Sequence, residues 1–234
     1  MNILFLDTET TGNDPQKDRL CQVCFKYSGG IETALFKPPI PISVKAMSVT
    51  HITNRIVEKS PAFKNSDFHS KLSTLLKNHT LVAHNAPFDV AILNTEGLEV
   101  PIYICTLRVA RHLDTEGVIP EYGLQFLRYY LDIDLVANAH DAEGDVLVLE
   151  AVFNRLFKKI KEGGLSDEEV LQQMITLTNT PVLIKTFAFG KYKGMPVAEV
   201  AKKDRGYLSW LLKQKQEEGG TDEDWIHTLE HYLQ

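Results

Sequence analysis

The chain has 234 residues, which is enough for one or two domains with a buried core. Its composition, with 44% hydrophobic and 24% charged residues, argues against a disordered or a membrane protein. The formal net charge of −6 argues against a protein coated in basic surface, but nucleic acid stays open as a ligand, because carboxylates gathered to hold metal ions also make a chain acidic.

The predicted elements begin with a strand over residues 3–7, a continuous apolar run typical of a strand that is buried on both faces. No run of apolar residues approaches the roughly 18 to 20 that a membrane span needs. Asp7 interrupts the first apolar run too early for a signal peptide, and no basic segment precedes it. We therefore expect a cytoplasmic protein without a membrane partner.

Two further strands are predicted at residues 20–27 and 31–37, separated by the turn signal Ser28-Gly29-Gly30. The first of them contains Cys21 and Cys24, whose C-x-x-C spacing invites a zinc or redox interpretation. Side chains three positions apart on a strand point to opposite faces, and no second C-x-x-C supplies further ligands. We expect both to be buried thiols.

The chain then alternates between helices and strands. Helices are predicted over residues 43–51 and 66–78, a strand over 81–83, a helix beginning near Pro87, a strand over 102–105, and helices over 106–113, 123–130 and 142–161. Three antiparallel strands followed by this alternation predict an α/β fold with a mixed five-stranded sheet flanked by helices, over residues 1–161. A helical connector over 162–180 and a small C-terminal α+β module over 181–234 complete the predicted domains.

Three groups of polar residues are candidates for the chemistry of the protein. Asp7 and Glu9 lie two residues apart, so strand geometry aims both carboxylates at one face. Like charges at that distance repel one another, and a hard divalent cation that both ligate removes the cost. Asp89 lies in the first turn of the helix after the strand at 81–83, a position that also suits an aspartate that only stabilises the helix dipole.

The third group is His140-Asp141-Ala142-Glu143-Gly144-Asp145. His140 and Asp145 lie about 140° apart on an ideal helix, so they face one site only if His140 precedes the helix. A histidine beside a carboxylate cluster has the pKa range of a general base. A helix cap by Asp141 is the structural alternative.

Together the three groups resemble the DEDD exonucleases of the His subtype, a family that includes proofreading subunits of DNA polymerases, ribonuclease T and oligoribonuclease. The motifs are D-x-E at Asp7 and Glu9, A-H-N-x-x-F-D at residues 83–89, and H-x-A-x-x-D at residues 140–145, with all five signature residues present. The resemblance implies a ribonuclease H-like exonuclease fold and a mechanism with two divalent cations, Mg²⁺ or Mn²⁺, roughly 3.5–4 Å apart.

The resemblance also implies roles for individual residues. Asp7 would bridge both metal ions, Glu9 and Asp145 would complete the site of one ion, and Asp89 would assist through water. His140 would take the proton from the attacking water. Glu9 and the backbone that follows it would receive the terminal 3′-OH of the substrate. The candidate substrate-binding residues are Thr10, Thr11, His51, His84 and Asn85.

The C-terminal module carries a predicted hairpin over residues 187–196 with a basic and aromatic tip, and an amphipathic helix over 204–213. The candidates for DNA contact are Lys191, Tyr192 and Lys193 of the tip. Lysines attract the phosphates, and a tyrosine ring offers a face on which a base can stack. A packing module with a solvated lysine-rich face is the alternative.

This tail narrows the resemblance to the exodeoxyribonuclease X branch of the family. That branch implies DNA 3′ ends as substrate, single- or double-stranded, release of nucleoside 5′-monophosphates, and a role in DNA repair. An exoribonuclease of the same family remains an alternative, because recognition of the 2′-OH depends on the shape of the pocket. A non-catalytic nucleic-acid-binding subunit is the alternative from another class. Oligomeric state is left open.

Overall fold

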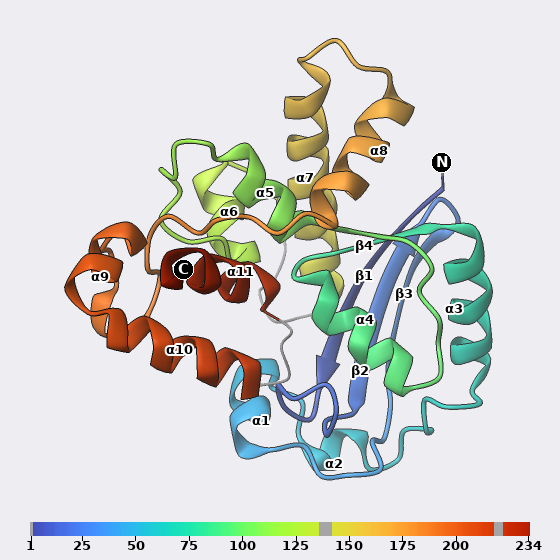
Figure 1. Cartoon of the computed structure of the whole chain (residues 1–234). Coiled ribbons are helices and arrows are strands. Elements are labelled where there is room, and N and C mark those ends of the chain that lie inside the picture. The colour runs from blue at the N-terminus through green and yellow to red at the C-terminus, as the bar shows by residue number, and fades with distance from the viewer. Residues whose placement is uncertain (1, 136–141, 218–221) are drawn as a thin grey trace.

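The computed structural model describes residues 2–135, 142–217 and 222–234. Its centre is a five-stranded sheet with the order β3-β2-β1-β4-β5 (Figure 1). The strands are β1 (Ile3–Thr10), β2 (Leu20–Tyr27), β3 (Gly30–Leu35), β4 (Thr80–Ala83) and β5 (Tyr103–Cys105). β1 pairs antiparallel with β2 and parallel with β4, so the sheet is mixed, as the sequence predicts.

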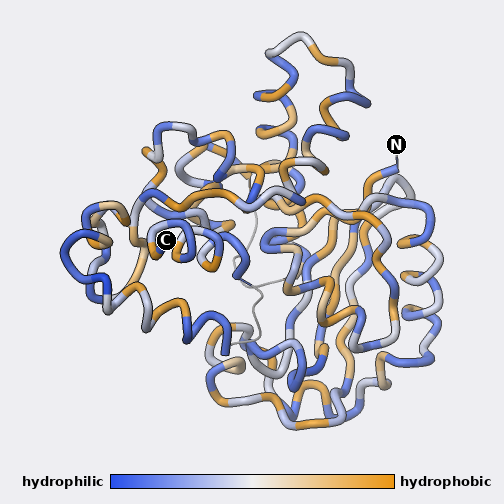
Figure 2. The backbone as a smooth tube through the Cα atoms, viewed as in Figure 1, coloured by the Kyte–Doolittle hydropathy of each residue, from blue (hydrophilic) through white to orange (hydrophobic). Residues whose placement is uncertain are grey.

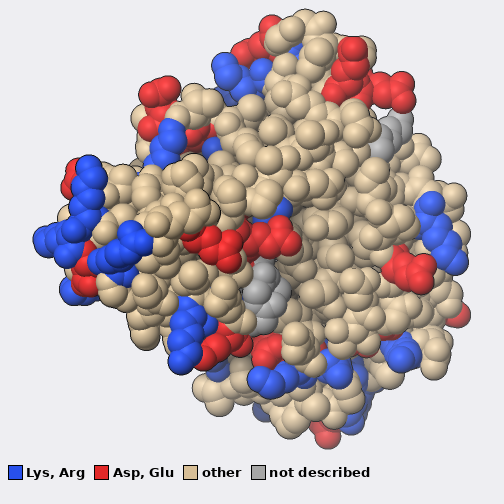
Figure 3. Space-filling model, in the orientation of Figure 1, with Lys and Arg blue, Asp and Glu red and all other residues tan. Residues whose placement is uncertain are grey.

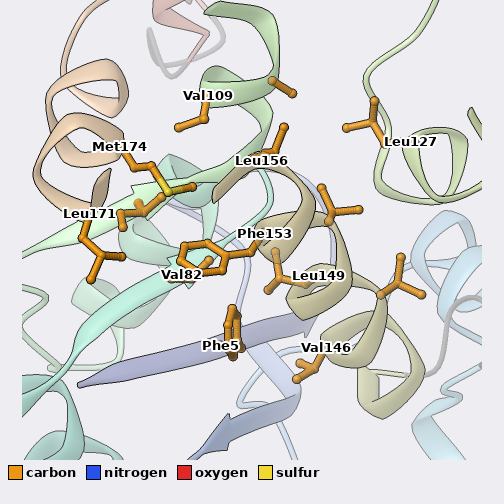
Figure 4. Close-up of a cluster of buried hydrophobic side chains, with 14 of the residues drawn as sticks. Phe5, Val82, Val109, Leu127, Val146, Leu149, Phe153, Leu156, Leu171 and Met174 are labelled. Carbon is orange, nitrogen blue, oxygen red and sulfur yellow. The ribbon is translucent and has the colours of Figure 1, made fainter. Parts of the chain in front are cut away.

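The alternation of side chains along β1 assigns each residue to one of two hydrophobic layers. Leu4 and Leu6 pack on one face with α3 (Asp67–Asn78) and α4 (Ala86–Thr95). Phe5 packs on the other face, where its ring meets that of Phe153 at 5.3 Å, edge to face (Figure 4). The hydropathy colouring of Figure 2 shows the resulting hydrophobic strands.

The second face of the sheet is covered by four helices. They are α5 (Thr106–Leu113), α6 (Leu124–Tyr130), α7 (Ala142–Lys161) and α8 (Asp167–Thr178). The predicted bounds of α7 are confirmed. α8 begins with a capping box between Ser166 and Glu169, and its Met174 lies in the same core as Phe153 of α7. The helix predicted as a connector therefore packs as part of the main core, and the domain boundaries at 161 and 181 stay predictions.

Two local features differ from the predicted elements, and a third confirms a prediction. β1 continues to Thr10 instead of ending at Asp7, because residues 8–10 still pair with β2. α1 (Val44–Thr50) is followed by a separate short helix, α2 (Asn54–Val57), that no pattern predicts. Cys21 and Cys24 are buried in different hydrophobic clusters on opposite faces of β2, which confirms the prediction of buried cysteines.

The C-terminal module is helical. It contains α9 (Val197–Lys203), α10 (Arg205–Glu217) and α11 (Glu223–Leu233), around a core that includes Phe187 and Trp225. The predicted hairpin is reduced to a single bridge between Thr186 and Pro196, because the intervening residues turn through a short 3₁₀ helix (Gly190–Tyr192). The strand part of the predicted α+β module is thus absent from its described residues.

The module is joined to α5 by buried charges. The Asp224 carboxylate is 2% exposed and accepts from Arg108 Nε at 3.0 Å and from Arg111 Nη1 at 2.6 Å. At the opposite end of the module, Lys193 pairs with Glu121 at 3.0 Å. In the part of the chain that the structure describes, every helix is too short or too polar to cross a lipid bilayer.

Candidate active site

Three carboxylates converge on the α7 side of the sheet. Asp7 and Glu9 follow Phe5 at intervals of two residues along β1, so they point to the same face as that ring. Asp145 lies in the first turn of α7, which covers this face. Ligand oxygens of Asp7, Glu9 and Asp145 all lie within 4.8 Å of one another. The structure therefore brings together three of the four predicted metal ligands in one cluster.

Asp89 reaches the same end of β1 from the opposite layer. Thr8 lies between Asp7 and Glu9 and points to the other face, where its hydroxyl donates to Asp89 Oδ1 at 2.7 Å. Asp89 is 5% exposed and its charge acts on Asp7. Asp89 does more than stabilise the dipole of α4, because its carboxylate is buried against β1 and accepts a hydrogen bond from Thr8.

The pKa shifts of these groups come first from burial, and for Asp7 and Glu9 also from repulsion between the carboxylates. Burial and the carboxylates of Asp89, Glu9 and Asp145 raise the pKa of Asp7 well above its usual value. Burial, with Asp145 and Asp89, raises the pKa of Glu9 to about 7. Burial also raises the pKa of Asp89 to about 7, although the hydrogen bond from Thr8 opposes the shift. A divalent cation ligated by oxygen relieves this repulsion, so the donor set fits Mg²⁺ or Mn²⁺.

Gln125 on α6 is a site residue that the sequence pattern does not reveal. Its side-chain amide donates to Asp145 Oδ1 at 2.5 Å, and its carbonyl oxygen lies 3.4 Å from Arg128 Nη1. Such an outer partner orients a metal-ligating carboxylate. A glutamine on an amphipathic helix carries no sequence signal, because only the packing of α6 on α7 brings it to Asp145.

A cavity of about 320 Å³ opens beside Glu9. Its polar lining comes from the end of β1 and from α1, and includes Thr8, Thr10 and Lys45. Its apolar lining includes Phe88 of α4 and Val49 of α1. The predicted substrate residue Thr10 therefore borders the cavity, while its hydroxyl donates to the Gly12 carbonyl at 2.6 Å.

Two predicted substrate residues make side-chain hydrogen bonds within the protein, and their contact with substrate stays a prediction. Thr11 is 1% exposed, and its hydroxyl bonds Asp18 at 2.7 Å and the backbone N–H of Arg19 at 3.0 Å, which fixes the loop after β1. Both ring nitrogens of His84 contact protein atoms. Nδ1 lies 2.9 Å from Thr106 Oγ1, and Nε2 lies 2.7 Å from the Tyr122 carbonyl oxygen. Burial lowers the pKa of His84 to about 4, so the ring is neutral and positions the end of β4.

The remaining substrate candidates are exposed. Asn85 lies at the N-cap position of α4 with φ 64°, and its side chain makes no capping hydrogen bond. His51 ends α1 with φ 59°, and its backbone N–H donates to the Met47 carbonyl. Their contact with substrate stays a prediction. His140, the predicted general base, lies outside the described residues.

The predicted DNA contacts of the module divide into two kinds. Lys191 and Lys193 are exposed, with ion pairs to Asp204 and Glu121 at 3.0 Å each. Tyr192 is only 7% exposed and donates its hydroxyl to Asp204 at 2.6 Å. Its ring therefore belongs to the core of the module and does not offer a face to a base, which corrects the proposed stacking role.

Comparison with protein families assigns a family to each of the two parts of the chain. Residues 4–153 match the family described as Exonuclease, and residues 187–216 match the Exodeoxyribonuclease X-like C-terminal family. Exodeoxyribonuclease 10 of Escherichia coli (strain K12) is 30% identical over 203 residues, which are 86% of this chain and 83% of the relative. DNA polymerase III subunit epsilon of Treponema pallidum (strain Nichols) is 32% identical over 166 residues, covering 64% of this chain and 74% of the relative.

Solved structures share the fold. A structure of exonuclease X in complex with 5′ overhanging duplex DNA superposes with a TM-score of 0.57 and 23% identity, covering 75% of this chain and 99% of that one. A structure of exonuclease I gives a TM-score of 0.59 and 22% identity, covering 75% of this chain and 43% of that one. These superpositions support the ribonuclease H-like fold that the motifs imply. The two family matches and the 30% identity to exodeoxyribonuclease 10 show that the chain belongs to the exonuclease family and carries an exodeoxyribonuclease X-like C-terminal domain.

Proposed function

We propose that this protein is a metal-dependent 3′→5′ exonuclease that removes nucleoside 5′-monophosphates from the 3′ ends of DNA. The observation that carries the proposal is the cluster of Asp7, Glu9 and Asp145, whose ligand oxygens lie within 4.8 Å of one another beside a cavity of about 320 Å³. The cluster supplies the metal-binding chemistry of phosphodiester hydrolysis, and the adjacent cavity has room for the end of a polynucleotide.

Asp7, Glu9 and Asp145, with the nearby Asp89, would hold the two divalent cations that the family resemblance implies, Mg²⁺ or Mn²⁺. When bound, the cations supply Lewis-acid stabilisation of the phosphate charge and make the attacking water more acidic. Thr8 and Gln125 hold the carboxylates of Asp89 and Asp145 in place. His140 would take the proton from the water, and His140→Ala is expected to leave a slow residual rate that increases with pH.

The cavity beside Glu9 is the proposed binding site for the 3′ end of the strand. Its lining combines the polar groups of Thr8 and Thr10 with the apolar side chains of Phe88 and Val49. Polar groups at the end of β1 would receive the terminal hydroxyl and sugar, and the apolar side chains would pack on the base. The preference for a free 3′-OH stays a prediction from the family resemblance, and this lining is where we propose that the hydroxyl binds.

DNA is proposed as the substrate because of the relatives. Exodeoxyribonuclease 10 covers most of the chain, and related solved structures include exonuclease X bound to duplex DNA and Escherichia coli exonuclease I bound to a dT13 oligonucleotide. A role in DNA repair stays a prediction.

The test uses 5′-labelled single-stranded DNA and RNA of the same sequence, with Mg²⁺, Mn²⁺ or EDTA, resolved on a sequencing gel. We expect a metal-dependent ladder that shortens from the 3′ end of the DNA, and much slower loss of the RNA. Faster loss of RNA would keep the mechanism and replace the substrate. No cleavage of either strand by the metal-loaded protein would overturn the proposal.

A further inference from the structure

Trp210 on α10 is an exposed aromatic residue with a rigid support. Its side chain is 53% exposed. On its inner side, the indole lies 5.5 Å from the Tyr207 ring at an interplanar angle of 36°. The Tyr207 ring in turn contacts Tyr192 at 5.0 Å and Phe187 at 5.8 Å. Trp210 is thus the outer end of a series of aromatic rings that begins in the core of the module.

This support distinguishes Trp210 from an ordinary surface residue. A single exposed hydrophobic side chain needs no functional explanation. Here, however, ring contacts fix the inner side of the indole, and Tyr207 is itself held by the loop at Gly190, where a Cβ would lie 2.7 Å from the Tyr207 hydroxyl. A ring that is already ordered loses little conformational freedom when a flat ligand stacks on its open face.

The charge of residues 185–217, the stretch that carries Trp210, indicates what that ligand is. Residues 185–217 contain eight Lys or Arg residues and three Asp or Glu residues, an excess of five positive charges in a chain whose net charge is −6. Lys202, Lys203 and Lys213 are exposed on α9 and α10, and blue side chains gather over α9 at the left edge of Figure 3. Lys213 lies one turn after Trp210 on the same helix.

An aromatic face among lysines is the combination that binds single-stranded nucleic acid, because bases stack on the ring while the cations attract the phosphates. A duplex does not offer unstacked bases, and an acidic peptide does not offer a flat ring at each residue. The surface therefore favours a single strand over either of these ligands.

We propose that Trp210 stacks on a base of the single strand whose 3′ end occupies the active site, and that the lysines of α9 and α10 bind its phosphates. This inference rests on the proposed function, since it assigns the module to the same substrate. It moves the stacking role in the module from Tyr192, which is buried, to Trp210. The module then increases affinity for long strands without taking part in the chemistry.

The test uses the fluorescence of the two tryptophans in the chain. Trp225 is 3% exposed, so quenching by oligo-dT in EDTA reports on Trp210. We expect quenching in the wild type and none in Trp210→Phe. Anisotropy with labelled strands of about 20 nucleotides should show that Trp210→Ala raises Kd roughly tenfold, the effect of losing one base–aromatic stack. Ser209→Ala, on the same exposed turn of α10, should bind like the wild type.

Activity on strands of different length separates this proposal from the proposed function. With Mg²⁺, Trp210→Ala should hydrolyse a trinucleotide at the wild-type rate, and should show a raised KM on the long strand with kcat unchanged. The stacking role would be overturned if Trp210→Ala bound the long strand as tightly as the wild type does and if oligo-dT did not quench the fluorescence of the wild type. A wild-type protein that hydrolyses neither strand would refute the proposed function instead.

Discussion

The buried carboxylate of Asp224 is expected to hold the C-terminal module against the catalytic domain. It is 2% exposed and accepts from the side chains of Arg108 and Arg111 and from the backbone N–H of Val182, which lies 3.1 Å from Oδ1. In Asp224→Ala these donors lose their acceptor, and both guanidinium groups stay in a buried region. Removing one partner of a buried ion pair costs roughly 3–5 kcal/mol.

The contacts that remain in the variant place the loss at the lower end of this range, at about 3 kcal/mol. Arg108 keeps a contact to Glu223 at 2.9 Å and one to the Thr178 carbonyl at 2.7 Å. Arg111 keeps its contact with the face of the Tyr122 ring, whose centroid lies 5.8 Å from the guanidinium carbon. Asp224→Asn should lose less, because its amide still offers one acceptor oxygen.

Urea unfolding, followed by far-UV circular dichroism and by tryptophan fluorescence, measures the loss. The matched control is Glu223→Ala, which removes the neighbouring carboxylate that also contacts Arg108 but is 55% exposed. An exposed pair contributes about 0–1 kcal/mol, so the control should unfold close to the wild type. If Asp224→Ala unfolded at the same urea concentration as Glu223→Ala, the inference that this carboxylate secures the module would be refuted.

Three further outcomes follow from the active site. Asp7→Asn should lower kcat by roughly a thousandfold or more, because it removes the shared metal ligand; near-normal turnover would contradict the two-metal assignment. Gln125→Leu should weaken Mn²⁺ binding in calorimetry by roughly 10- to 100-fold, because Asp145 loses the amide that orients it, whereas unchanged affinity would show that the hydrogen bond has no such role. The pKa values of Glu9 and Asp89, each about 7, lie above those of the same groups in an unfolded chain. In the metal-free protein the folded state therefore binds more protons than the unfolded state, and the free energy of unfolding should fall as pH rises toward about 7. Protons compete with metal over the same range, so the thermal shift caused by Mg²⁺ should be larger near about pH 8 than near about pH 6, and equal shifts would contradict the raised pKa values.

The elements that the sequence predicts well are those with a strong repeating pattern. The apolar positions of α7 recur at helical spacing, and its observed bounds, Ala142–Lys161, match the prediction. The turn at residues 28–30 joins β2 and β3 as predicted. α2 was missed because four residues are too short for a periodic signal. The hairpin predicted at residues 187–196 became a 3₁₀ turn because the module core requires Tyr192 to point inward.

Short-range geometry also explains why the carboxylates of Asp7 and Glu9 could be predicted to lie together. The spacing of Asp7 and Glu9 on a strand places both carboxylates on one face, whatever the rest of the fold does. Asp89 and Asp145 could be linked to them only through the combined motifs, because residues far apart in sequence carry no geometric relation of their own. The general base at His140 still depends on that resemblance alone.

The sequence by itself therefore determined the class of sheet, the main helices, the family and the pair of carboxylates on β1. The tertiary structure alone decided which neighbours the other predicted residues have. Gln125 lies beside Asp145, the His84 ring contacts Thr106 and Tyr122, and Tyr192 is buried inside the module. The physical reason is that periodicity along one element fixes which face a side chain occupies, whereas its partners depend on how separate elements pack. A polar side chain has the same sequence signature whether it meets substrate, another side chain or water.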